Sequence, residues 1–170
     1  MDDTSHGSTL RPGSEFIEEA RLILAGERDR LAALLTGGFE LDLVGGSSVP
    51  AALTKGDIDL HLRVPAPDFD RAVAALRGVY QVVHPEIWQE SLATFAVPAA
   101  LPTGVAVTPI GSGHDVRFRR SWQLLAADPR LVEAYNAVKL RHRDVPEDYE
   151  RHKSAFFDTL LAAHSSFSRE

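Results

Sequence analysis

Two aspartates at positions 57 and 59 are the residues whose type and spacing could support metal and phosphate chemistry. The run from Ile58 to Val64 alternates apolar and polar residues, which predicts a β-strand. Successive side chains of a strand point to opposite faces, so Asp57 and Asp59 share one face and Ile58 and Leu60 the other. Neighbouring ionised carboxylates repel each other unless a cation lies between them. Magnesium prefers oxygen ligands, so we predict that Asp57 and Asp59 are both the metal ligands and the catalytic residues.

A glycine- and serine-rich segment, Val44-Gly45-Gly46-Ser47-Ser48-Val49-Pro50, comes just before the aspartates. Residues 39–44 alternate apolar and acidic residues, which predicts another strand that ends at the two glycines. Serine is a common N-cap and proline suits the first turn of a helix, so a short helix is expected next. The start of a helix presents backbone N–H groups that phosphate can accept. We therefore predict phosphate binding by Gly45, Gly46, Ser47 and Ser48.

Basic and aromatic residues later in the chain could complete a phosphate site. Tyr135 and Lys139 are four residues apart on an expected helix and so share a face. Tyr149 and Lys153 repeat this spacing on the next expected helix. Two such faces could meet over the site, with Tyr135, Lys139 and Lys153 contacting the nucleotide and Lys55 reaching a phosphate. The alternative is that each lysine stem packs on a tyrosine ring at an ordinary helix surface.

Together these motifs resemble the GrpB family, within the nucleotidyltransferase superfamily of the polymerase-β-type fold. The resemblance runs from about Phe39 to about Leu161 and rests on residues 44–50 with Lys55 and Asp59, and on the paired Tyr-x-x-x-Lys helices. It implies an α/β (α+β) fold, a nucleotidyltransferase-like mixed β-sheet flanked by helices with a helical C-terminal part. It also implies Mg²⁺-dependent nucleotidyl transfer, in which the nucleotidyl group of ATP or a related triphosphate passes to an unknown acceptor (adenylylation).

The sequence departs from the family pattern at three places. Ala51-Ala52 replaces the usual Gly-Leu, Asp57 stands where an apolar residue or proline is common, and Ala106 replaces a histidine on a later strand. That strand, residues 105–109, also lacks a third carboxylate, for which Glu90 and Asp115 are the nearest candidates. Two alternatives therefore stay open, namely an ATP-dependent amide-forming ligase that acts through an acyl-adenylate, and a non-catalytic nucleotide-binding module.

Composition bounds the classes of protein to consider. A chain of 170 residues that is 44% hydrophobic and 25% charged fits one compact domain. The net charge of −6 argues against general nucleic-acid binding, and the absence of cysteine excludes disulfides and zinc–thiolate sites. No apolar run is long enough to cross a membrane, and no signal-peptide pattern is present. We expect a cytoplasmic protein whose partners are a nucleoside triphosphate and an unidentified small-molecule acceptor.

The expected organisation is a disordered leader, residues 1–13, followed by one domain over residues 14–170. We expect His61 to lie at the surface beside the aspartates, and residues 111–115 to form a mobile turn that can close over a ligand. The predicted helices span residues 15–35, 69–76, 121–127, 129–142 and 146–163. The predicted strands span residues 39–44, 58–64, 79–83, 92–97 and 105–110.

Overall fold

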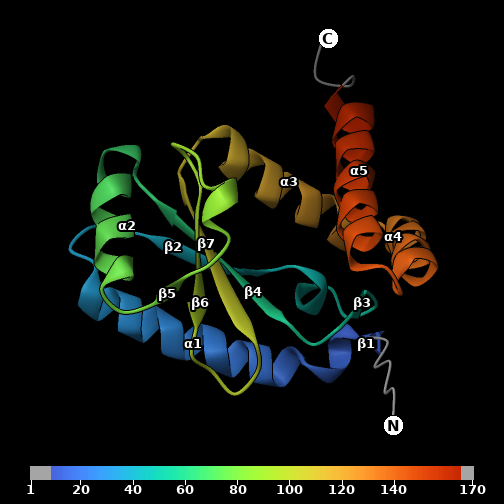
Figure 1. Cartoon of the computed structure of the whole chain (residues 1–170), viewed down its shortest axis with the longest axis horizontal. Coiled ribbons are helices and arrows are strands. Elements are labelled where there is room, and N and C mark those ends of the chain that lie inside the picture. The colour runs from blue at the N-terminus through green and yellow to red at the C-terminus, as the bar shows by residue number, and fades with distance from the viewer. Residues whose placement is uncertain (1–8, 166–170) are drawn as a thin grey trace, which may run out of the picture.

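A computed structural model describes residues 9–165 and contains a five-stranded mixed sheet flanked by helices, with a helical C-terminal region (Figure 1). The predicted fold is confirmed. The strands of this sheet are β2 (Glu40–Val44), β4 (Ile58–Val64), β5 (Gln81–Val82), β6 (Ala93–Val97) and β7 (Thr103–Pro109). The helices are α1 (Ile17–Leu34), α2 (Phe69–Arg77), α3 (Gly113–Ala127), α4 (Pro129–His142) and α5 (Pro146–Ser165).

The sheet order is β2-β4-β7-β6-β5, which places β4 and β7 side by side at its centre. These two strands run parallel, and every other pair in the sheet is antiparallel. In this register Asp59 lies opposite Val44 on β2 and opposite Gly104 on β7. The aspartate therefore sits next to the end of β2, where the chain enters the glycine turn.

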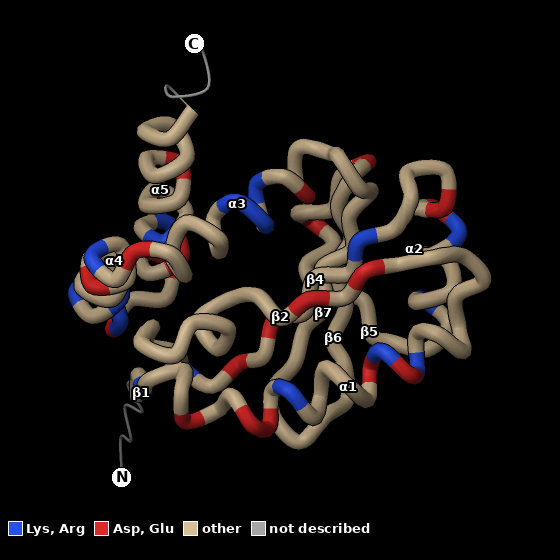
Figure 2. Tube along the Cα trace, turned by 180° about the vertical axis from the view of Figure 1, so that it is seen from behind, with Lys and Arg blue, Asp and Glu red and all other residues tan. Residues whose placement is uncertain are grey.

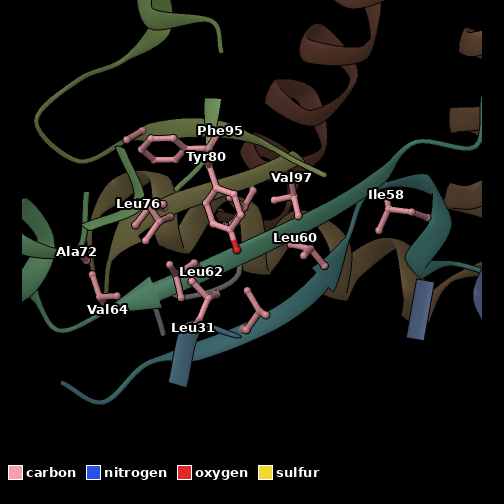
Figure 3. Packing of buried hydrophobic residues seen from close by; sticks show 14 of the residues in the cluster. Leu31, Ile58, Leu60, Leu62, Val64, Ala72, Leu76, Tyr80, Phe95 and Val97 are labelled. Atoms are coloured by element: carbon pink, nitrogen blue, oxygen red, sulfur yellow. The ribbon is translucent and has the colours of Figure 1, made fainter. Parts of the chain in front are cut away.

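The main core lies between one face of the sheet and helices α1 and α2 (Figure 3). Ile58, Leu60, Leu62 and Val64 of β4 point into it and are almost fully buried, as the alternation of the sequence predicts. Leu31 of α1 and residues of α2 pack against them. Full burial of a leucine or isoleucine side chain stabilises the folded state by about 1.5–3 kcal/mol, so this face fixes the orientation of β4 and hence of Asp59.

The opposite face of β4 is also covered, and here the prediction for His61 was wrong. Its side chain is fully buried, its Nε2 lies 2.8 Å from Thr108 Oγ1, and its ring packs on Phe118 of α3. Arg63, one pleat further, is buried and bonds to Asp115 with two nitrogens, at 2.5 and 3.0 Å. This ion pair joins the start of α3 to β4. Helix α3 therefore covers the polar residues His61 and Arg63, which the alternation of the sequence alone would place in solvent.

Three local expectations are corrected. The chain after the glycine turn forms one 3₁₀ turn, Gly46–Ser48, in place of a helix, and then enters β3 (Leu53–Thr54). Helix α3 begins at Gly113 rather than at residue 121, because the Ser112 side chain caps it by accepting the N–H of Asp115. Residues 113–115 are therefore the first turn of a helix, which overturns the expected mobile turn.

The expected leader is also partly structured. Arg11–Pro12 form strand β1, which pairs antiparallel with β3, and Gly13 donates its N–H to Ala52 O at 2.7 Å. Residues 1–8 of that leader lie outside the described residues. Among residues 9–165, no helix combines the length and the apolar composition that crossing a bilayer requires.

Candidate functional site

A cavity of about 510 Å³ opens between the sheet and the C-terminal helices. Its walls come from the end of β2, the glycine turn, β4, β6, β7, and helices α3, α4 and α5. The fold thus brings together residues that are more than 100 positions apart in the sequence, such as Gly45 and Lys153. The predicted site residues that line it are Gly45, Gly46, Lys55, Asp57, Asp59, Tyr135, Lys139 and Lys153.

The two aspartates both line this cavity, one just before β4 and one within it. Gly45 makes room for Asp59, since a Cβ at that glycine would come within 2.9 Å of Asp59 Cγ. Gly45 also has a positive φ of 76°, which L side chains rarely adopt. Protein atoms crowd Asp59 although its carboxylate stays open to the cavity, and this desolvation raises its pKa to about 6. Lys153 opposes that rise, while the charge of Asp57 adds to it.

Three lysines surround the other side of the cavity and rest on two tyrosine rings. Lys139 Nζ lies 4.5 Å from the centre of the Tyr135 ring, and Lys55 and Lys153 lie 4.2 and 4.7 Å from that of Tyr149. Such contacts stabilise an ammonium group without neutralising it. The helix faces predicted from the Tyr-x-x-x-Lys spacing therefore do meet over one cavity, although Lys153 also pairs with Glu150 at 3.3 Å.

Lys139 is the most buried of these lysines, with 2% of its surface exposed. Among residues 9–165, no carboxylate lies within 4 Å of its ammonium group. Burial and the nearby charge of Lys153 lower its pKa to about 7, although Asp59 partly opposes this. A Cβ at Gly46 would lie 3.4 Å from Lys139 Nζ, so this ammonium group borders the glycine turn. A buried cation without an anionic partner is costly, and an anion bound at the turn would relieve that cost.

Both tyrosines remain protonated in this setting. Burial raises the pKa of Tyr135 well above its ordinary range, and burial together with Glu150 raises that of Tyr149 to about 12. Their hydroxyl groups can therefore donate hydrogen bonds at neutral pH, and their rings can support the lysines without adding negative charge.

The two serines of the glycine turn do not line the cavity. Ser47 is fully buried and donates its hydroxyl to Asp57 O at 2.8 Å, while Ser48 donates to Gly45 O at 2.6 Å. Both hydroxyls thus hold the backbone that carries Gly45 and Asp57. The expectation that these side chains point at a ligand is corrected, because their hydroxyl protons are used within the turn itself.

Asn136 is a positioning residue that sequence reasoning missed. Its Oδ1 accepts the N–H of Leu53 at 2.8 Å and its Nδ2 donates to Ala51 O at 2.9 Å. Helix α4 is thereby tied to the segment that follows the glycine turn, and Lys139 lies one turn further along the same helix. A signal was present, because Asn136 stands between Tyr135 and Lys139 in the motif itself.

The third carboxylate sought in the sequence is not found at either candidate position. Asp115, in the first turn of α3, is hydrogen-bonded to Arg63 of β4. Glu90 does not line the cavity. The β7 positions that lie beside Asp59 and His61 are Gly104 and Ala106. Glu150 does line the cavity, yet no group of three or more metal-ligating side chains occurs among residues 9–165.

The donor set can nevertheless accommodate Mg²⁺ with a phosphate ligand. Magnesium in proteins is usually held by one or two carboxylates and completes its coordination with water and substrate phosphate oxygens. Asp57 and Asp59 supply two carboxylates at the cavity wall. Figure 2 shows basic positions on α3, and both basic and acidic positions on the α4–α5 pair. The positive charge that lines the cavity comes from Lys55, Arg117, Lys139 and Lys153.

Comparison with known proteins places this geometry in context. The model of the GrpB protein family matches residues 20–163, which is most of the chain. The UPF0157 protein VC_A0354 of Vibrio cholerae is 28% identical over 139 residues, which cover 77% of this chain and 70% of that protein. The crystal structure of the conserved protein GrpB from Enterococcus faecalis aligns with a TM-score of 0.63 at 13% identity, over 90% of this chain and 99% of that one.

The same fold occurs in a nucleotide-bound polymerase. Cid1 poly(U) polymerase aligns with a TM-score of 0.52 in a mutant bound to MgATP and 0.53 in a form bound to MgGTP. Each alignment has 15% identity and covers 76% of this chain. This chain spans only 43% of Cid1, so the likeness concerns the nucleotidyltransferase-like fold and not the activity.

Proposed function

The chain belongs to the GrpB family, and we propose that it is a Mg²⁺-dependent nucleotidyltransferase that adenylylates an acceptor with ATP or a related triphosphate. One observation carries the proposal. Two carboxylates and three lysines meet around one cavity at a glycine turn. A metal-bound polyphosphate is the ligand whose charges match that arrangement, with a cation at the aspartates and anionic oxygens at the lysines.

The proposed roles follow from position. Asp57 and Asp59 hold the metal, which neutralises charge on the triphosphate oxygens. Gly45 and Gly46 let the backbone approach the phosphates, and Lys139 borders that turn. Lys55 and Lys153 add positive charge on the same side of the cavity as Lys139, and Tyr135 and Tyr149 hold the lysines in place.

In the proposed reaction, an acceptor oxygen or nitrogen attacks the α-phosphorus in line, and the bond to the β-phosphate breaks. Pyrophosphate leaves with the electron pair, and a proton leaves the acceptor if it carried one. No protein nucleophile is required, so catalysis comes from positioning and from electrostatic stabilisation of the reacting phosphate. An amide-forming ligase that acts through an acyl-adenylate would use the same first step, and it remains the alternative activity.

A non-catalytic nucleotide-binding module is the second candidate, and one observation favours it. Gly104 and Ala106 occupy the positions on β7 that lie beside Asp59 and His61. Neither can bind a metal through its side chain, and two carboxylates alone could hold a nucleotide without turning it over.

Two measurements separate these functions. A co-crystal with Mg²⁺ and a non-hydrolysable ATP analogue should place the metal between Asp57, Asp59 and the phosphates. Pyrophosphate release from ATP, measured with and without added acceptors, should occur in the wild-type protein and vanish in Asp59→Asn. Nucleotide binding without pyrophosphate release would favour the module, and a nucleotide bound away from the two aspartates would overturn both functions.

A further inference from the structure

The cavity continues past Asp59 to a second wall that the nucleotide proposal does not use. This wall consists of β6, β7, the residues directly after β5, and α3, and we call it the α3 wall. Its lining includes Thr94, Ala106, Arg117, Phe118 and Ser121. None of these residues belongs to the glycine turn or to the lysine cluster.

The part of β7 next to the α3 wall carries small residues. Ala106 lies between His61 on β4 and Thr94 on β6, and Gly104 is its neighbour on the same face of β7. A strand face built from glycine and alanine leaves space above the sheet. That space adjoins Asp59, because Gly104 lies directly opposite Asp59 in the register.

Helix α3 supplies polar and aromatic groups above these small residues. Arg117 and Ser121 are four residues apart and therefore share a helix face. Ser121 is 3% exposed, and its Oγ lacks a hydrogen-bond partner among residues 9–165. Buried hydroxyls are nearly always hydrogen-bonded, so the Ser121 hydroxyl beside the cavity is available to bond a ligand. Phe118 and Trp122, on the same helix, add an aromatic surface.

Arg117 has capacity to bind an anion. One of its nitrogens, Nη1, donates to Asp158 Oδ1 at 2.7 Å, and Asp158 is itself 64% exposed. An exposed ion pair of this kind contributes little to stability. The remaining N–H groups of the guanidinium have no hydrogen-bond partner among the described residues. Arginine recognises a carboxylate with two parallel hydrogen bonds, which adds geometric selectivity.

Backbone strain marks the rim of the same wall. His84 has a φ of 48°, and it is the one non-glycine residue with positive φ among residues 9–165. It lines the cavity, and its ring is exposed. Strain of this kind concentrates at ligand sites.

We propose that the α3 wall is the acceptor subsite and that it binds the carboxylate of a small apolar or aromatic acid. This proposal rests on the proposed function, and it selects acyl-adenylate formation. A carboxylate oxygen attacks the α-phosphorus of the nucleotide and forms an acyl–phosphate bond. The bond to the β-phosphate breaks, and pyrophosphate leaves with the electron pair. A carboxylate is already deprotonated at neutral pH, so the step transfers no proton and needs no general base.

Benzoate is a suitable probe, and NMR titration measures its binding directly. We expect the wild-type protein to bind it with a dissociation constant of about 1 mM, as a fragment of this size allows. Arg117→Gln should weaken binding by about tenfold or more, because a charge-assisted hydrogen bond is lost. Ala106→Leu should abolish it by filling the space above this part of β7. Asp158→Asn is the matched control and should bind benzoate at least as well, because it frees the guanidinium.

The outcomes separate this proposal from the nucleotide proposal. If benzoate binds equally well to wild type, Arg117→Gln and Ala106→Leu, the acceptor subsite is wrong. If phenyl phosphate binds at Arg117 and benzoate does not, the carboxylate assignment is wrong. Calorimetry with MgATP is run on the same samples, and both variants should keep the wild-type affinity. Benzoate binding in a protein that does not bind MgATP would refute the proposed function while leaving the carboxylate subsite standing.

Discussion

The carboxylate of Asp59 lies directly against Gly45, at a point where the backbone allows no side chain. A Cβ at Gly45 would come within 3.0 Å of both Cβ and Cγ of Asp59, and the φ of 76° there disfavours other residues. The glycine turn and the aspartate strand therefore fit each other closely. Anything that fills the space at Gly45 moves the carboxylate that we assign to the metal.

Gly45→Ala should therefore weaken Mg²⁺-dependent ATP binding by about 10–100-fold and lower the free energy of unfolding by at least about 1 kcal/mol. The new methyl group displaces Asp59 and strains the turn at once. Calorimetry and chemical denaturation measure the two effects.

Gly38→Ala is the matched control for this change. A Cβ at Gly38 would meet nothing within 4 Å, and Gly38 lacks a positive φ. It should leave nucleotide binding unchanged. Equal losses in the two variants would mean that the contact between Gly45 and Asp59 has no functional role.

Lys139→Met should lower the affinity for ATP without lowering the stability of the fold. Methionine keeps most of the buried stem of the lysine but removes a charge that burial disfavours. We expect unchanged or higher stability and about tenfold or greater loss of ATP affinity, since a phosphate contact is lost. Thermal unfolding and calorimetry test the pair of effects. A destabilised variant with normal ATP affinity would reduce Lys139 to a packing residue.

Asn136→Ala should loosen the link between α4 and the segment after the glycine turn. It leaves Leu53 N without its partner, whereas water can reach the exposed Ala51 O, so we expect a cost of about 1 kcal/mol in unfolding free energy. ATP affinity should fall as well, because Lys139 lies on the same helix. Asn136→Asp keeps the acceptor for Leu53 N and should retain more of the affinity. If the two variants behave alike in binding, the tie does not position Lys139.

His61 predicts a specific acid sensitivity of the fold. Burial lowers its pKa from 6.5 to about 4, so the unfolded chain binds a proton at a higher pH than the folded chain does. Folded-state stability is therefore lost as the pH falls from about 6.5 toward 4. The loss attributable to His61 between pH 7 and pH 5 is about 2 kcal/mol.

His61→Gln should flatten this pH profile, and denaturation curves at pH 5, 6 and 7 measure it. The raised pKa of Asp59 gives the opposite slope, with stability falling as the pH rises through about 6. Both proteins retain Asp59, so the difference between their profiles reports His61. If the stability of wild type and of His61→Gln changed with pH in the same way, the conclusion that His61 is buried in its neutral form would be wrong.

Part of this molecule could be predicted from local patterns. Alternation identified β4 and its core face, because Leu60 and Leu62 satisfy period two and are buried. The four-residue spacing correctly predicted that Tyr135 and Lys139 share a helix face, and that Tyr149 and Lys153 share another. The glycine turn followed from composition, because few residues other than glycine adopt a φ of 76°.

The remaining features depend on contacts that local patterns do not encode. His61 has the parity of an exposed residue, and only the packing of α3 makes it buried. The buried pair of Arg63 and Asp115 joins residues 52 positions apart. The α3 wall likewise combines residues from distant elements, so no spacing rule reveals Ser121 as a cavity residue.

The most direct measurement of the central claim is calorimetric titration of ATP with and without Mg²⁺, in wild type and in Asp57→Asn/Asp59→Asn. We predict that the wild-type protein binds ATP at least about tenfold more tightly with Mg²⁺ and that the double variant loses this dependence. Thermal unfolding should show that the variant is folded. ATP affinity that is indifferent to Mg²⁺ in wild type, or that keeps its Mg²⁺ dependence in the double variant, would contradict the assignment of these aspartates.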